Sequence, residues 1–258
     1  MTKVELQIPK QDGSKLAAML YHARLMQKSK PPLIILCHGF TGDKEEWGRF
    51  PKTAQALINA NYDALLFDFS GSGSNPRQPV HLFKQVEDLE QVTSWAKREG
   101  YEKIGSIGLS FGGITSLLAD IPDRNVAVFW APGFFMKRII GKVRMALAKF
   151  IIKITRTPLK RGASQGAILM GKQFFKDISE VDVEPILREF TTPSLIIQGL
   201  EDNSVKPDMT RDAFSMMPED GDHRLLEIKG ATHNFNGQEL DKFISHTLNF
   251  LNEYLKIT

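Results

Sequence analysis

The feature of this sequence that most limits its possible folds is an alternation between short apolar runs and longer amphipathic segments. Six runs are apolar enough to be strands buried on both faces, at residues 33–37, 64–67, 104–109, 126–131, 195–197 and 225–228. Between them, amphipathic patterns predict helices at about residues 48–60, 82–98, 111–120, 207–217 and 238–255. This alternation predicts an α/β fold, in which helices cover both faces of a mostly parallel sheet.

The first 21 residues add two more predicted strands. Lys3–Ile8 and Lys15–Tyr21 flank the turn sequence Gln11-Asp12-Gly13-Ser14, a pattern that is typical of an antiparallel hairpin. The sheet is therefore predicted to have eight strands, within a single domain that spans residues 1–258.

The strongest indication of chemistry is the G-x-S-x-G pentapeptide Gly108-Leu109-Ser110-Phe111-Gly112. It directly follows a predicted strand and opens a predicted helix. A serine on such a turn projects its hydroxyl above the sheet, and small neighbours are needed because the turn is crowded. The bare pattern also occurs by chance in glycine-rich turns. Its place between a strand and a helix makes Ser110 the predicted nucleophile.

A histidine and a carboxylate follow the serine in the chain at suitable places. A serine hydroxyl becomes a good nucleophile when an imidazole accepts its proton, and an acid then stabilises the imidazolium. His233 lies in the loop after the last predicted strand, and Asp202 follows the strand before it. Glu201 and Asp208 could compete for the role of the acid, although Asp208 is better placed to cap the next helix.

Acyl transfer also needs two N–H donors for the negative charge that develops on the carbonyl oxygen. The backbone N–H of Phe111 is one predicted donor, because it follows the nucleophile. The second is expected in the loop His38-Gly39-Phe40-Thr41-Gly42, where Phe40 N–H is the candidate. We interpret His38 as a residue that shapes this loop rather than as a second base.

Three other polar features have structural interpretations. Asp68-Phe69-Ser70-Gly71-Ser72-Gly73-Ser74 follows a strand but matches neither a P-loop nor a dinucleotide fingerprint, so we expect a turn at the pocket rim. His223 begins a strand and would lie at the opposite edge of the sheet, and His246 lies within a helix. No His, Cys, Asp or Glu cluster has metal-ligand spacing, so we expect no metal and no cofactor.

Taken together, five segments resemble the α/β-hydrolase superfamily over nearly the whole chain. They are His38–Gly42, Asp68–Ser74, Gly108–Gly113, Gly199–Asp202 and Gly230–His233. The H-G-F-T-G form is similar to that of small bacterial esterases, which include cinnamoyl and feruloyl esterases, and it also resembles monoacylglycerol lipases and acyl-thioester hydrolases. The resemblance implies a Ser110–Asp202–His233 triad and oxyanion donors at Phe40 and Phe111.

The alternation breaks between about residues 134 and 190, where the sequence predicts amphipathic helices and no strand. This segment would form a helical lid over the end of the sheet that carries the loops. It holds eleven Lys or Arg residues from Lys137 to Lys176 and no acidic residue before Asp177. From residue 136 its apolar residues form one helical stripe: Met136, Ile139, Ile140, Val143, Leu147, Phe150, Ile151 and Ile154.

Two interpretations of this basic amphipathic segment differ in what its apolar stripe covers. The favoured one is a lid helix whose apolar side covers the active site and whose basic side faces water. In the alternative, the helix lies on a membrane surface or attracts anionic substrates. The ester would then be lipid-derived or otherwise acidic, and Lys137, Arg138 and Lys142 would favour its turnover.

The predicted function is hydrolysis of a small-molecule carboxylic ester through an acyl-enzyme on Ser110. An acyl-thioester hydrolase or a peptidase would use the same triad, and a non-catalytic ligand-binding hydrolase fold is the alternative of another class. The single cysteine, Cys37, excludes an internal disulfide, and the N-terminus has no secretory pattern, so we expect a cytoplasmic protein. We expect no nucleic-acid partner, and the sequence does not indicate an oligomeric state.

Overall fold

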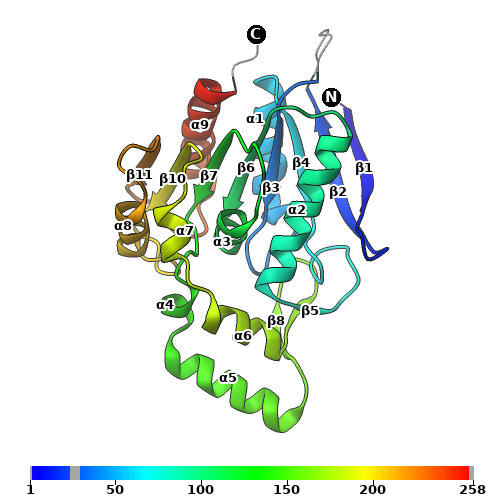
Figure 1. Ribbon diagram of the computed structural model, residues 1–258, viewed down its shortest axis with the longest axis vertical. Helices are drawn as coiled ribbons and strands as arrows, with labels where there is room; N and C mark the ends of the chain where they lie inside the picture. Colours follow the sequence, from blue (N-terminus) through cyan, green and yellow to red (C-terminus); the bar gives the residue numbers. More distant parts are fainter. Residues whose placement is uncertain (1, 24–29, 256–258) are drawn as a thin grey trace.

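The computed structural model describes residues 2–23 and 30–255, and its main feature is an eight-stranded sheet. The strand order is β1-β2-β4-β3-β6-β7-β10-β11, and every pair from β4 to β11 is parallel (Figure 1). The strands are β1 (Thr2–Pro9), β2 (Lys15–His22), β3 (Leu33–Cys37), β4 (Asp63–Phe67), β6 (Ile104–Leu109), β7 (Val126–Trp130), β10 (Ser194–Gly199) and β11 (His223–Ile228). β1 and β2 form the predicted antiparallel hairpin. The predicted mostly parallel eight-stranded sheet is confirmed.

Helices cover both faces of the sheet and create two hydrophobic cores. In β3, Leu33, Ile35 and Cys37 pack into one core, whereas Ile34 and Leu36 pack into the other. This alternation explains why the strand sequence is continuously apolar. One face is covered by α1 (Arg49–Asn59) and α9 (Gly237–Tyr254), and the other by α2 (Leu82–Arg98), α3 (Phe111–Leu118), α7 (Glu184–Arg188) and α8 (Pro207–Met216). A short 3-10 helix, Glu46–Gly48, precedes α1.

The segment between β7 and β10 is an insertion beyond the carboxyl ends of the parallel strands (Figure 1). It contains α4 (Met136–Ile140), α5 (Lys142–Thr155), β8 (Leu159–Gly162), β9 (Ala167–Met170), α6 (Lys172–Glu180) and α7. The expectation that this segment lacks strands is wrong. β8 and β9 form a hairpin, and β9 pairs with β5 (Pro79–Val80) from the main body of the chain. β8 is too short and polar to be recognised locally, and the β5 partner lies far away in the sequence.

The predicted apolar stripe is split at Gly141, which separates α4 from α5. Gly141 has a φ of 79°, a value that ends α4 and changes the direction of the chain. Met136, Ile139 and Ile140 on α4 consequently face the pocket described below. The members of the predicted stripe on α5 are exposed instead, whereas three other apolar residues of α5, Met145, Ala148 and Ile152, are buried. The expectation of one continuous apolar side over the active site is therefore wrong for α5.

Candidate active site

Ser110 lies on a strained turn between β6 and α3. Its φ of 52° and ψ of −110° are unusual for a residue with a side chain. The turn depends on its glycines. A Cβ on Gly108 would lie 2.6 Å from Gly112 O, and a Cβ on Gly112 would lie 2.1 Å from Cys37 O. These contacts explain why small residues flank the serine.

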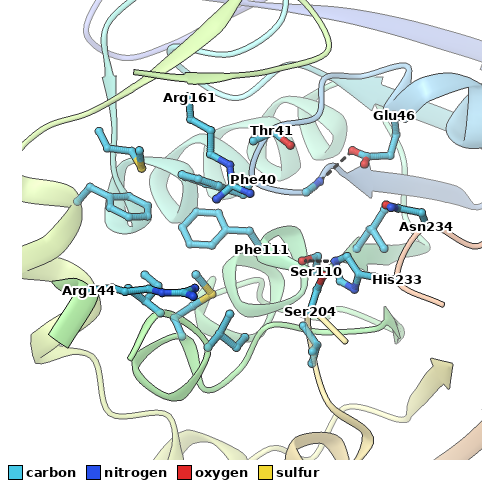
Figure 2. Close-up of a pocket in the computed structure, with 18 of the residues that line it drawn as sticks. Phe40, Thr41, Glu46, Ser110, Phe111, Arg144, Arg161, Ser204, His233 and Asn234 are labelled. Carbon is cyan, nitrogen blue, oxygen red and sulfur yellow. Dashed lines mark hydrogen bonds between the residues drawn. The ribbon is translucent and has the colours of Figure 1, made fainter. Parts of the chain in front are cut away.

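The structure brings Ser110, His233 and Asp202 together in a hydrogen-bonded chain. His233 Nε2 lies 3.0 Å from Ser110 Oγ, and His233 Nδ1 lies 2.7 Å from Asp202 Oδ2 (the serine contact is drawn in Figure 2). The three residues come from the loops after β6, β10 and β11, which meet because the carboxyl ends of parallel strands share one edge of the sheet. A base in this position can accept the serine proton, and the carboxylate can hold the imidazole in one orientation.

Asp202 is itself held rigidly. Its side chain is buried, and Oδ1 accepts the backbone N–H groups of Ser204 and Val205 at 2.8 and 2.9 Å. Gln198 Nε2 lies 3.3 Å from Oδ2. The competing carboxylate Glu201 instead accepts the backbone N–H of Gly230, at the base of the histidine loop.

The two candidate oxyanion donors come from loops on either side of Ser110. Phe111 is the first residue of α3, and Phe40 lies in the loop after β3. Among the described residues, neither backbone N–H has a hydrogen-bond acceptor. Both N–H groups are therefore free to bind a substrate oxygen. His38 is buried, its Nδ1 lies 2.8 Å from Gly39 O, and its Nε2 accepts Phe69 N–H at 3.2 Å. This arrangement confirms that His38 shapes the loop.

Glu46 anchors the same loop, and sequence analysis did not identify it. Its buried carboxylate accepts Gly39 N–H at 2.9 Å on Oε2 and Arg49 Nη2 at 2.9 Å on Oε1. A Cβ on Gly42 would lie 2.0 Å from Oε2, so the loop closes tightly around this carboxylate. Burial raises the pKa of Glu46, and His38, Arg49 and the Gly39 N–H oppose that shift. The available signal in the sequence was only an acid seven residues after Gly39 with Arg49 three residues later, because the burial of Glu46 is seen in the structure alone.

Two other polar features that were predicted to be structural form hydrogen bonds within the fold, although no residue from 68 to 74 lines the pocket. Asp68 is buried and accepts hydrogen bonds from Ser74 N–H, Lys44 N–H and Lys44 Nζ. These hydrogen bonds stabilise the glycine-rich loop after β4 as a turn. His223 begins β11 at the opposite end of the strands, where its Nδ1 lies 2.8 Å from Ser194 Oγ. Among the described residues, no group of three His, Cys, Asp or Glu side chains could hold a metal ion.

Ser110 and His233 open into a pocket of about 470 Å³. Its lining is both apolar and polar, and its apolar residues are Phe40, Trp47, Leu109, Phe111, Met136, Ile139, Ile140, Ala148, Met170, Phe174, Phe175 and Val205. Phe40 stacks on Phe174 with ring centroids 5.1 Å apart, which joins the oxyanion loop to the insertion. The insertion thus supplies much of the wall opposite the serine.

Two arginines from the insertion add positive charge to the pocket wall. Arg144 comes from α5 and Arg161 from β8, and both line the pocket. Figure 2 shows Arg161 reaching over Phe40 and Arg144 extending toward Phe111; the Arg161 guanidinium lies 5.8 Å from the Phe40 ring centroid. Within the described part of the chain, neither arginine forms an ion pair. Lys137, Arg138 and Lys142 do not line the pocket, and Arg138 pairs with Asp212 at 2.6 Å.

A family model described as the alpha/beta hydrolase family matches residues 34–245 of this sequence. The chain belongs to the alpha/beta hydrolase family. Among curated proteins, it is 34% identical over 102 residues to an uncharacterized 31.7 kDa protein of Escherichia coli, covering 38% of this chain and 35% of that protein. It is 32% identical over 109 residues to a carboxylesterase of Bacillus subtilis (strain 168), covering 38% of this chain and 41% of that protein.

A further relative matches almost end to end, although at lower identity. Polyketide transferase ATR5 of Stachybotrys chlorohalonatus (strain IBT 40285) is 23% identical over 299 aligned residues, covering 99% of both chains. The first curated relatives, in contrast, match over only about a third of their own length.

Several solved esterases share the fold. Est1E from Butyrivibrio proteoclasticus, solved with ferulic acid bound, has a TM-score of 0.79 at 22% identity, covering 98% of this chain and 100% of Est1E. The Pyrococcus furiosus esterase Pf2001 has a TM-score of 0.73 at 18% identity, covering 98% and 93%. The monoacylglycerol lipase of Paleococcus ferrophilus has a TM-score of 0.72 at 19% identity, covering 93% and 99%. The predicted superfamily is confirmed by the family model, and these solved structures show that the chain shares their fold.

Proposed function

We propose that this protein is a serine hydrolase that cleaves carboxylic esters through an acyl-enzyme on Ser110. The observation that carries the proposal is the chain Ser110 Oγ–His233 Nε2–His233 Nδ1–Asp202 Oδ2, with separations of 3.0 and 2.7 Å, in which Ser110 and His233 line the pocket. A nucleophile, a base and an orienting acid in this order are the parts that acyl transfer needs.

In the acylation step, His233 Nε2 accepts the Ser110 hydroxyl proton while Oγ attacks the ester carbonyl carbon. The carbonyl oxygen becomes negatively charged, and the N–H groups of Phe40 and Phe111 donate hydrogen bonds to it. The tetrahedral intermediate then collapses and the bond to the alcohol oxygen breaks. His233 gives its proton to that oxygen, so that the alcohol leaves and the acyl group stays on Ser110.

In the deacylation step, water occupies the position that the alcohol has left. His233 Nε2 accepts a proton from the water, and the resulting hydroxide attacks the acyl carbon. The same two N–H groups stabilise the second oxyanion. When the bond to Oγ breaks, His233 returns the proton to Ser110, and the carboxylic acid is released. Asp202 remains ionised throughout and stabilises each imidazolium.

A fluorophosphonate probe tests this function directly, because it reacts with an activated serine and not with an ordinary one. The wild-type protein should be labelled and Ser110→Ala should not. Ser204→Ala is the matched control, since Ser204 also lines the pocket but contacts Asp202 only through its backbone N–H. A folded wild-type protein that resists labelling would refute the catalytic function and favour a ligand-binding role.

A substrate panel then separates the alternatives that share this triad. It comprises p-nitrophenyl esters from acetate to palmitate, a feruloyl ester, an acyl-CoA and a peptide amide. We expect turnover of the simple esters. Labelling by the probe with turnover of acyl-CoA alone would instead assign a thioesterase, and turnover of the peptide alone would assign a peptidase.

We also propose that the insertion is a lid and that it selects esters carrying an acidic group. Arg144 and Arg161 place two cations in the pocket wall, and neither has an ion-pair partner among the residues that the structure describes. The carboxylate Glu46, which also lines the pocket, is already bound to Arg49 and the Gly39 N–H, so it does not neutralise them. A substrate with a carboxylate or phosphate remote from the ester bond would place its charge beside these arginines.

Matched pairs of esters measure this preference. The p-nitrophenyl monoester of adipic acid and p-nitrophenyl hexanoate have equally long acyl chains and differ in the terminal carboxylate. Because both arginines are partly solvated, each should contribute about 1 kcal/mol, or about fivefold in kcat/KM, to turnover of the anionic ester. Arg144→Gln and Arg161→Gln should each remove that factor, whereas Lys149→Gln, outside the pocket, should not. Equal losses on both esters would contradict the assignment.

A further inference from the structure

Helix α5 carries an exposed apolar stripe that the proposed active site does not use. Its members and their exposed fractions are Val143 (83%), Leu147 (57%), Phe150 (60%), Ile151 (37%) and Ile154 (64%). At 100° per residue these five positions fall within about a third of the helix circumference. The stripe lies on the outermost element of the insertion, away from the sheet (Figure 1). Large apolar side chains gathered on one exposed face are typical of an interaction surface.

The stripe is not a core face left uncovered, because α5 already has another buried face. Met145, Ala148 and Ile152 are each less than one-tenth exposed, and they lie on the opposite side of the helix. They pack in the same hydrophobic core as Phe174 and Phe175 of α6. The helix is therefore held to the protein by one face while its larger apolar face remains available.

Basic side chains border the stripe on both sides. Lys142 and Lys153 lie along one border, and Arg144 lies along the other. Lys149 lies further round the helix, where its Nζ donates to Ser179 Oγ of α6 at 3.0 Å. No acidic residue occurs between Lys137 and Lys176, so α5 itself and the chain on either side of it carry charge of one sign. Long basic side chains beside an apolar face can extend to lipid phosphates while the apolar residues enter the bilayer.

The charge distribution decides between two possible occupants of the stripe. In a symmetric dimer built on α5, the stripe of one copy would meet the stripe of the other, and the bordering lysines would also meet. Like charges brought together in this way oppose association. An anionic bilayer offers apolar chains to the stripe and negative headgroups to its borders.

We propose that α5 docks on the surface of an anionic phospholipid bilayer, lying in the plane of the interface with residues 143, 147, 150, 151 and 154 inserted. The rest of the protein remains outside the bilayer. Since Arg144 and Ala148 of the same helix line the pocket, docking brings the pocket wall to the lipid surface. The attachment itself does not depend on the proposed hydrolase activity, so each can fail without the other.

Vesicle flotation of the full-length protein tests the proposal. Vesicles of phosphatidylcholine with 30% phosphatidylglycerol should carry wild-type protein at low salt, and pure phosphatidylcholine vesicles should carry at least tenfold less. The Leu147→Ser/Phe150→Ser/Ile154→Ser variant should lose at least tenfold in partitioning. The Lys142→Gln/Lys149→Gln/Lys153→Gln variant should lose on the order of a hundredfold, since each basic residue near an anionic surface contributes about fivefold. The control Val4→Ser/Phe83→Ser removes exposed apolar residues outside the insertion and should bind normally.

Two further measurements test whether each variant folds and whether α5 itself enters the lipid surface. Thermal unfolding must show that each variant folds, and Phe150→Trp provides a reporter whose emission should shift to the blue on anionic vesicles. Wild-type protein that stays unbound, or an apolar triple variant that floats like wild type, would overturn the proposal. A wild-type dimer in light scattering that becomes monomeric in the apolar triple variant would assign the stripe to a second copy of the chain instead.

Discussion

Replacing Glu46 with glutamine should damage both the stability and the catalytic rate of this protein. The native carboxylate accepts Gly39 N–H on one oxygen and Arg49 Nη2 on the other, both at 2.9 Å. Glutamine has one acceptor oxygen and one NH₂ group. Whichever way the amide turns, its NH₂ must face another donor, either Gly39 N–H or the Arg49 guanidinium. Neither side is exposed enough for bulk water to replace the lost acceptor.

The size of the effect follows from these contacts. Arg49 is 5% exposed, its Nε has no hydrogen-bond partner among the described residues, and Glu46 is its carboxylate partner. Removing one partner of a buried ion pair costs about 3–5 kcal/mol. For a chain of this size that corresponds to a fall in Tm of roughly 6–20 °C. Losing the contact between residue 46 and Gly39 N–H should also shift the loop that carries Phe40. Because this shift moves Phe40 N–H away from the oxyanion, the loss of one donor should lower kcat by about 10²–10³.

The assay compares Glu46→Gln with Glu45→Gln, which removes a charge from the exposed neighbouring residue. Tm from calorimetry and kcat and KM on p-nitrophenyl butyrate are measured for both, with kcat read well below the lower Tm. We expect Glu46→Gln to lose kcat while KM changes little, because the oxyanion donor acts in the transition state. A variant that is folded and unstable but retains wild-type kcat would refute the link between Glu46 and the oxyanion loop.

Three other predictions concern separate parts of the structure. Asp202→Asn should lower kcat by about 10⁴ without unfolding the protein, as measured in the ester assay, because an amide can favour the wrong histidine tautomer. Burial raises the pKa of the Cys37 thiol, so a thiol reagent at pH 8 should react with it only after unfolding by guanidinium; rapid reaction of native protein would contradict its burial. Burial lowers the pKa of His223 below its usual 6.5, so the unfolded chain binds more protons near that value. Stability should therefore decrease as pH falls below about 6.5, and His223→Gln should reduce this dependence in urea unfolding at pH 5 and 7.

Much of the fold could be predicted because its strands and helices carry local patterns. A central strand such as β3 is buried on both faces, so its whole sequence is apolar wherever the rest of the chain lies. The turn around Ser110 is equally local, since Gly108 and Gly112 are required by contacts within and beside the turn itself. Chain order and the strand ends then placed Asp202 and His233 at the same edge of the sheet.

The insertion shows what such patterns leave undecided. Its helical periodicity predicted one apolar stripe from Met136 to Ile154, but the structure divides that stripe between two helices, because the direction of each part depends on how one helix joins the next. Gly141 turns α4 toward the pocket and leaves the stripe of α5 outside. The pairing of β9 with β5 likewise joins segments that are distant in the sequence.

By itself, then, the sequence determined an α/β-hydrolase fold and the three residues predicted as its triad, because period, turn chemistry and chain order are local properties. Only the tertiary structure decided that Glu46 supports the oxyanion loop, that Arg144 and Arg161 line the pocket, and that the α5 stripe is exposed. Each of these depends on contacts between distant segments or on the angle between neighbouring helices. Such relationships arise when the chain packs, and no periodicity within a single segment encodes them.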